Sequence, residues 1–104
     1  MADAFNNLSP AEAERLALLA EECAEVIQVV GKILRHGYRS THPADPNGLD
    51  NGELLAQELG DVRAAVTLML RAGDLDEDLI EEARDSKLER VGQYLHHNKA
   101  RLTP

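Results

Sequence analysis

Apolar residues recur at helical spacing along most of this 104-residue chain. In about residues 9–36 they return every three or four positions, which places them on one side of an α-helix. The positions of this first stripe are Leu16, Leu19, Ala20, Cys23, Val26, Ile27, Val30 and Ile33. Two further stretches, about 50–73 and 74–97, have the same periodicity. The pattern predicts an all-α fold, a small helical bundle with about three main helices.

Capping residues indicate where the first helix begins and ends. Ser9 can cap the helix, Pro10 suits the first helical position, and Glu12 completes a capping box. Gly37 is placed to end the helix, because glycine readily leaves the helical conformation. We therefore expect the helix to start at Pro10 and to stop at Gly37.

The second helix is expected to start at Asp50 or Asn51, with Glu53 near its third position, and to stop near Gly73. The loop before it, about residues 37–50, has roughly 14 residues, whereas connections in helix bundles usually have about 2–8. Loops of that length are often functional or mobile. A tolerated insertion is the alternative, and the sequence leaves both open.

The third helix is expected to start at Asp74 or Asp76 and to continue to about His97. The tail of residues 99–104 is expected to fray, as chain ends commonly do. Within these limits the third helix has its own apolar positions, and Gly92 weakens it slightly.

The length suits one domain, residues 1–104, with its core at about 9–98. A domain this small buries only a modest fraction of its surface, so helices with open apolar faces gain by associating. We therefore expect a four-helix-type core that is completed by oligomerisation into a homo-dimer or homo-tetramer.

The chain has 19 acidic residues against 11 Lys and Arg, which gives a net charge of −8. This argues against nucleic-acid binding, which relies on cationic side chains to displace counterions from phosphate. A small phosphorylated ligand remains compatible, because a bound cation can reverse the local sign of the charge. No apolar run approaches membrane-spanning length, and the N-terminus lacks the features of a signal peptide. We expect a cytoplasmic protein that binds neither nucleic acid nor membrane.

The single cysteine, Cys23, excludes an internal disulfide and fits a reducing compartment. Its central position on the first apolar stripe predicts a buried structural thiol, not a nucleophile.

Two acidic pairs occupy matching places in the first two helices. Similar segments align there at a constant offset of 36 residues, which puts Glu22 and Glu25 in register with Glu58 and Asp61. Residues three apart lie on the same side of a helix, and here that side is the edge of the apolar stripe. If the two helices pack antiparallel, the four carboxylates can converge.

Converging carboxylates repel one another, and without a cation some of them are pushed toward the protonated form. A hard divalent ion removes this conflict. Mg²⁺ prefers oxygen ligands and shares its coordination shell with substrate phosphates, and it can polarise a phosphoryl oxygen. We expect Glu22, Glu25, Glu58 and Asp61 to bind Mg²⁺, with Mn²⁺ as a substitute. The alternative is that each acidic pair belongs to an ordinary solvated helix face.

These residues resemble the motif of the MazG-like, all-α nucleoside triphosphate pyrophosphohydrolases. That family has a Glu-Glu-x-x-Glu on one helix and a Glu-x-x-Asp on the next. Here the two halves read Glu21-Glu22-Cys23-Ala24-Glu25 and Glu58-Leu59-Gly60-Asp61. The resemblance extends over roughly residues 12–97, although the loop between the two halves is longer than in compact members of the family.

The resemblance implies an oligomeric helical bundle that binds magnesium. It implies conversion of a ribo- or deoxyribonucleoside triphosphate and water into the monophosphate and pyrophosphate, by attack of metal-activated water near the α-phosphate. By motif match, Glu22, Glu25, Glu58 and Asp61 are the metal ligands. The resemblance also implies catalytic roles for Glu22 and for Glu21, which can assist as a base.

Cationic residues near the end of the first helix are candidates for substrate binding. Lys32 lies seven residues after Glu25 and therefore projects to nearly the same side, where it can meet a triphosphate. Arg35 is a candidate for a mobile phosphate contact. A cation near a helix C-terminus is favourable in any case through the helix dipole, and this is the reading we favour for His36.

Lys87 and Tyr94 are further candidates for substrate binding, on the third helix. Lys87 lies in line with Tyr94 on the apolar face, where a lysine must reach water or meet an acid or a phosphate. Tyr94 can support that contact or stack on a base, or it can simply pack.

The sequence contains no glycine-rich phosphate loop and no pattern that supports a serine or cysteine triad. Besides the triphosphate pyrophosphohydrolase, two functions stay open. One is a related phosphohydrolase that acts on alarmone or dUTP-type nucleotides. The other is a non-catalytic helical interaction module with a structural cation site.

Overall fold

The computed structural model describes residues 5–97, which form three α-helices and one short 3₁₀ helix. The helices are α1, Pro10–His36; α2, Asn51–Arg71; α3, Glu77–Arg90; and η1, Val91–Gln93. No β-strand occurs within the described range, so the predicted all-α fold is confirmed. None of the helices in this range is both long enough and apolar enough to cross a membrane.

The chain divides into two compact units, Met1–Ala72 with α1 and α2, and Gly73–Pro104 with α3 and η1. The expected single domain of residues 1–104 stays a prediction, and so does its completion by further copies of the chain. The tail predicted at 99–104 lies outside the described residues.

α1 extends over 27 residues, and both of its ends are stabilised as predicted. The Ser9 hydroxyl accepts a hydrogen bond from the Glu12 backbone N–H at 3.1 Å, and the Glu12 carboxylate accepts one from the Ser9 N–H at 2.8 Å. At the other end, Gly37 has a φ of +87°, which favours glycine, and its N–H bonds to the Ile33 carbonyl at 2.7 Å. The predicted start and stop are both confirmed.

α2 begins with a second capping box. The Asp50 carboxylate accepts a hydrogen bond from the Glu53 N–H at 2.8 Å, and the Glu53 carboxylate accepts one from the Asp50 N–H at 3.2 Å. The helix ends at Arg71, just before Gly73, whose φ is +81°. The predicted limits of this helix are confirmed as well, because the capping chemistry is local to the sequence.

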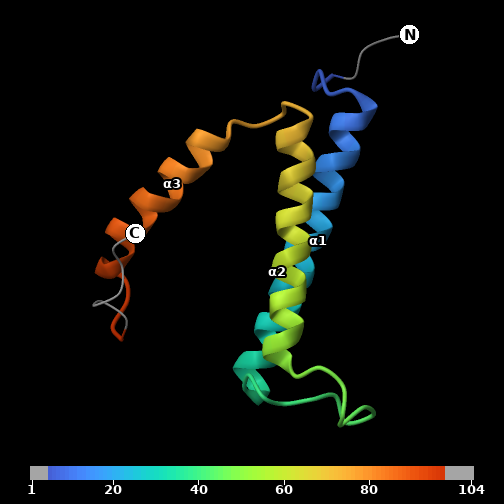
Figure 1. Ribbon diagram of the computed structural model, residues 1–104, viewed down its shortest axis with the longest axis vertical. Coiled ribbons are helices and arrows are strands. Elements are labelled where there is room, and N and C mark those ends of the chain that lie inside the picture. Colours follow the sequence, from blue (N-terminus) through green and yellow to red (C-terminus); the bar gives the residue numbers. More distant parts are fainter. Residues whose placement is uncertain (1–4, 98–104) are drawn as a thin grey trace. The chain divides into compact units, whose positions relative to one another are not determined.

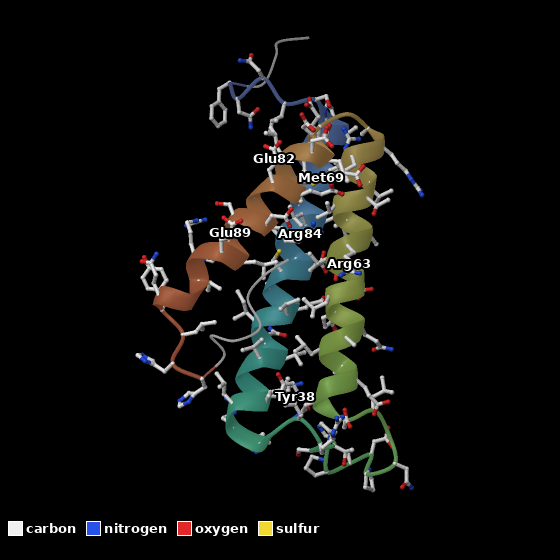
Figure 2. The ribbon with its side chains drawn as sticks, turned by 60° about the vertical axis from the view of Figure 1, so that its left-hand side comes forward. Tyr38, Arg63, Met69, Glu82, Arg84 and Glu89 are labelled. Carbon is white, nitrogen blue, oxygen red and sulfur yellow. The ribbon has the colours of Figure 1, made fainter. Side chains whose placement is uncertain are left out.

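α1 and α2 form an antiparallel hairpin, side by side with the connecting loop at one end (Figure 1). Met69 lies toward the end away from the loop, and Tyr38 lies at the loop end (Figure 2). Ala65 is only 1% exposed, and a methyl side chain buried this completely indicates that the two helix backbones approach closely.

The side of α1 that packs on α2 differs from the apolar stripe that dominates the sequence. It includes Leu18, Glu22, Glu25 and Val29, which are buried or half-buried. Much of the predicted stripe is exposed instead: Leu16, Ala20, Cys23, Ile27 and Val30. The expectation of a buried thiol is therefore wrong for the single chain. The apolar arc of α1 is wider than one contact face: Leu19, Val26 and Ile33 of the predicted stripe are half-buried with the acids, and the rest of the stripe stays exposed.

The long loop is fastened to the start of α2. Asn51, which is 7% exposed, donates its backbone N–H to the Ser40 carbonyl at 2.9 Å and its side-chain amide to the Gly37 carbonyl at 3.2 Å. The Gly52 N–H donates to the Tyr38 carbonyl at 2.8 Å. These bonds give the loop a defined path against the helix end.

α3 starts after the capping residue Asp76, as predicted. The sequence predicts a helix that continues to about His97, but α3 ends at Arg90 and the chain tightens into η1. That part of the prediction is wrong. Gly92 disfavours a continued helix and lies in η1, where the helix has ended.

Candidate metal centre

Four carboxylates from two helices converge in the hairpin. Glu22 and Glu25 belong to α1, Glu58 and Asp61 belong to α2, and one oxygen of each lies within 4.8 Å of the others. The members of each pair are three residues apart and so project from the same side of their helix. Antiparallel packing turns these two sides toward each other. The structure thus brings together the four acids that the sequence singles out, and we call them the carboxylate cluster.

The carboxylate cluster is partly withdrawn from solvent. Glu22, Glu25 and Glu58 are half-buried, whereas Asp61 is exposed. The Oε2 atoms of Glu22 and Glu58 are buried and have no hydrogen-bond partner. A buried carboxylate oxygen without a donor loses its hydration and receives nothing in return, which is unfavourable. The charged forms of Glu22 and Glu58 are therefore disfavoured unless a proton or a cation compensates for the lost hydration.

Burial and mutual repulsion raise the pKa values of two cluster members. Burial raises the pKa of Glu22 above its ordinary value of 4.5, and the charges of Glu25, Asp61 and Glu21 add to the effect. For Glu58, a hydrogen bond with the Glu25 carboxyl is the largest cause of the raised pKa, followed by burial and the neighbouring charges. A hydrogen bond between two carboxyl groups requires a proton on one of them. Without a cation, the cluster therefore retains protons at higher pH than isolated glutamates do.

The donor set fits a hard divalent cation. All four groups are carboxylates, and Mg²⁺ and Mn²⁺ favour such oxygen ligands. The cluster contains neither histidine nor cysteine, which are the ligands preferred by softer metals. A cation would offset the repulsion and would give the buried oxygens of Glu22 and Glu58 a partner.

Glu21 precedes the cluster but does not belong to it. It is exposed, and it is absent from the group of converging carboxylates. Consecutive residues of a helix point about 100° apart, so Glu21 projects from a different side of α1 than Glu22. Its charge still acts on Glu22 by raising the pKa of that residue. Its role as a base stays a prediction.

A cavity of about 270 Å³ lies at the loop end of the hairpin. Lys32 and Arg35 both line it, so the structure brings these two cationic candidates to one place, and His36 lies there with them. With a rise of about 1.5 Å per residue, Lys32 lies roughly 10 Å along the helix axis from Glu25. The cavity is therefore separate from the carboxylate cluster but near it.

Four polar residues of this cavity were not predicted from the sequence. They are Ser40, Thr41 and His42 from the loop and Asn51 from α2. Their placement depends on the path of the loop, which local patterns do not reveal. One signal was available, because residues 26–44 contain no Asp or Glu in an otherwise acidic chain.

Lys87 and Tyr94 belong to the second compact unit. Lys87 is exposed in the last turn of α3, and Tyr94 follows η1 with 71% of its surface exposed. The predicted alignment of the two on one apolar helix face is wrong, because α3 ends before Tyr94 and buries none of its residues. Their contact with a substrate stays a prediction.

No protein-family model, no curated protein and no solved structure matches this chain. The resemblance to the MazG-like enzymes therefore stays a prediction from the motif residues. The functional argument depends on the geometry of the carboxylate cluster and of the cavity beside it.

Proposed function

We propose that the chain is a Mg²⁺-dependent nucleoside triphosphate pyrophosphohydrolase of the MazG-like type. It converts a ribo- or deoxyribonucleoside triphosphate and water into the monophosphate and pyrophosphate. The proposal is carried by the carboxylate cluster, whose four oxygens from two helices lie within 4.8 Å of one another. Two of its members have a buried oxygen without a partner, which an ordinary solvated helix face does not have.

Each cluster residue has a defined part in this proposal. Glu22, Glu25, Glu58 and Asp61 hold the cation through their carboxylate oxygens. When bound, a divalent cation polarises a phosphoryl oxygen and lowers the pKa of a coordinated water. Asp61 is exposed, which leaves its side of the cluster open to an approaching phosphate. Glu21, the exposed residue before Glu22 on α1, would assist as a base toward the attacking water.

The charge of the protein makes this reaction dependent on the cation. The chain has a net charge of −8, and a metal-free carboxylate cluster repels a polyphosphate. The cation reverses the sign at this one place. We assign phosphate contacts to Lys32 and Arg35. Contacts of Lys87 and Tyr94 with a substrate stay a prediction.

Product analysis by anion-exchange chromatography tests the reaction. The purified chain is incubated with Mg²⁺ and a panel of ribo- and deoxyribonucleoside triphosphates. Monophosphate and pyrophosphate are expected. Glu58→Gln should lose this activity, whereas Glu14→Gln, which neutralises an exposed glutamate of α1 outside the cluster, should keep it. Equal turnover in wild type and Glu58→Gln contradicts the assigned metal site.

Other products separate the competing functions. Diphosphate and orthophosphate would retain the metal site but contradict attack near the α-phosphate. Turnover confined to alarmone or dUTP-type nucleotides would indicate the related phosphohydrolase. A wild-type chain that binds Mg²⁺ but hydrolyses none of these would favour the non-catalytic interaction module.

We also propose that the chain functions as a homo-oligomer. Six residues of α1 form an exposed line with alternating spacings of four and three, and we call this line the exposed seam. It consists of Leu16, Ala20, Cys23, Ile27, Val30 and Leu34. This spacing is the pattern by which helices pair in coiled coils and antiparallel bundles.

The burial in a single chain supports this proposal. Among the described residues, the buried apolar side chains are Val29, Ala65 and Met69. In contrast, Ile27 is 71% exposed and Leu34 is 83% exposed. The exposed seam contains no charged residue, so a second copy can cover it through the same surface on both partners.

A further inference from the structure

The cavity at the loop end of the hairpin gathers hydrogen-bond donors from two parts of the chain. It has a volume of about 270 Å³, and Leu54 at the start of α2 forms part of its wall. The donors are Lys32, Arg35, His36, Ser40, Thr41 and His42. The first three come from the last turns of α1, and the other three come from the loop.

The segment that builds this cavity is positive within an acidic protein. Residues 26–44 contain Lys32, Arg35 and Arg39 but no Asp or Glu, although the whole chain has 19 acidic residues. Arg39 pairs with Asp50 at 3.2 Å, so its charge is already balanced. No carboxylate of residues 5–97 lies within ion-pair distance of Lys32 or Arg35. Their two charges therefore remain available to a ligand.

The wall formed by the loop is held in place before any ligand binds. Asn51 fastens the loop through its hydrogen bonds to Ser40 and Gly37. His42 Nδ1 accepts the backbone N–H of Ala44 at 3.0 Å. In the neutral ring the proton then resides on Nε2, which is left as a donor. A preformed set of donors lowers the cost of ordering upon binding.

We propose that this cavity binds a phosphoryl oxyanion directly, without a divalent cation, and is a second anchor for the substrate of the carboxylate cluster. Lysine, arginine, hydroxyl and imidazole donors are together the groups that bind phosphoryl oxygens in proteins. Leu54 of the cavity wall lies four residues before Glu58 on α2, a rise of about 6 Å, so a polyphosphate can extend from one site to the other. The role as a second substrate anchor rests on the proposed function, whereas the binding of an oxyanion in the cavity does not.

The two sites select the substrate by opposite charges. The carboxylate cluster binds the cation that accompanies a polyphosphate. The cavity binds a phosphoryl oxyanion of the same polyphosphate that is not coordinated by the cation. A triphosphate with its cation satisfies both sites, whereas the monophosphate product carries too short an anionic group to span them. The arrangement therefore retains the triphosphate and releases the monophosphate.

Calorimetric titration of the full-length chain with inorganic pyrophosphate in the presence of EDTA tests the anion site. Metal-free acidic residues repel pyrophosphate, so binding under these conditions reports on the cavity. Wild type should bind. Lys32→Ala/Arg35→Ala should bind at least about tenfold more weakly, because the hydrogen bonds of two charged donors to the oxyanion are lost. Lys32→Arg, which retains the charge, should restore binding relative to Lys32→Ala.

Arg63→Ala/Arg71→Ala is the matched control, since it removes two exposed arginines of α2 that do not line the cavity. Figure 2 shows Arg63 on α2, away from the loop end. This variant changes the net charge by the same amount and should bind pyrophosphate as wild type does. Absence of binding by wild type, or equal weakening in the two double variants, overturns the anion site.

Steady-state kinetics test the role of the cavity as a substrate anchor, with a nucleoside triphosphate that the wild type hydrolyses. Lys32→Ala/Arg35→Ala should raise KM while kcat changes little, the result expected when binding is lost equally in ground and transition state. An unchanged KM overturns the anchor role. If pyrophosphate binds as described but no triphosphate is hydrolysed, the proposed function fails and the anion site stands. If a triphosphate is hydrolysed but pyrophosphate does not bind without metal, the anion site fails and the proposed function stands.

Discussion

Glu22 Oε2 and Glu58 Oε2 lie on facing sides of two different helices, both buried and both without a hydrogen-bond partner. Buried polar atoms in folded proteins are nearly always satisfied, so these two oxygens are exceptions. The two residues are 36 positions apart and hold matching places in their helices. A divalent cation is the partner that would satisfy both oxygens and offset their repulsion.

Removing divalent cations should lower the stability of the chain. At a Mg²⁺ concentration about a hundredfold above its dissociation constant, binding to the folded state alone stabilises by about 2.7 kcal/mol. Differential scanning fluorimetry with Mg²⁺ and with EDTA measures the shift in Tm. Glu58→Gln should respond much less to Mg²⁺, and without metal it should melt above wild type, because a neutral amide replaces a repelled carboxylate. An identical Tm for wild type in both buffers contradicts a metal site in the folded state.

The raised pKa values of Glu22 and Glu58 predict how metal-free stability depends on pH. A carboxyl whose pKa is raised on folding contributes stability that is fully present below its ordinary value of 4.5 and is lost as pH rises through the raised value. Urea unfolding in EDTA should therefore show wild type gaining stability, relative to Glu58→Gln, from about pH 7 to about pH 5. A difference that does not change with pH contradicts the shift at Glu58.

Asp50 affects the pH dependence of stability in the opposite direction to Glu22 and Glu58, and in a lower range of pH. The hydrogen bond from the Glu53 backbone lowers the pKa of Asp50 below its ordinary value of 3.8, assisted by Arg39. Its contribution is present above that value and is lost as pH falls through the lowered one. Measurements that stop at about pH 5 therefore isolate the effect of the carboxylate cluster.

Ala65 should tolerate no larger side chain. It is 1% exposed between α1 and α2 and lies one helical turn beyond Asp61. Ala65→Leu should cost about 1–3 kcal/mol of stability, because extra methylene groups in a packed interface force the helices apart. The same separation should weaken Mg²⁺ binding. Ala64→Leu is the control, since Ala64 is exposed, and it should change neither quantity. Urea unfolding and Mg²⁺ titration of both variants provide the comparison.

The helix ends were predictable because their chemistry is local. Ser9 with Glu12 and Asp50 with Glu53 form the capping boxes that their spacing indicates. The meeting of the four acids was also predictable, since each pair repeats at i and i+3 and antiparallel packing turns the two pairs toward each other. In these places, local sequence and tertiary structure agree.

The rest required tertiary information. Cys23 and Val29 both lie on apolar parts of α1, and only the contact with α2 decides that Val29 is buried and Cys23 exposed. The cavity depends on the hydrogen bonds of Asn51, which join residues more than ten positions apart. The chain tightens into η1 after Arg90, although the helical periodicity of apolar residues continues to Leu95.

The exposed seam predicts how substitution at Ile27 affects assembly. In an isolated chain Ile27 is 71% exposed, so Ile27→Glu should be nearly neutral. If a second copy covers the exposed seam, the substitution loses the burial of an isoleucine side chain, worth about 1.5–3 kcal/mol per chain, and places a charge in the interface. We expect Ile27→Glu to reduce the molar mass measured by light scattering after gel filtration and to lower Tm.

Gln28→Glu is the control for this prediction. It adds the same charge at the neighbouring exposed position outside the exposed seam and should leave the molar mass and Tm unchanged. A variant that keeps the wild-type mass and Tm would show that another surface mediates assembly, or that the chain is a monomer.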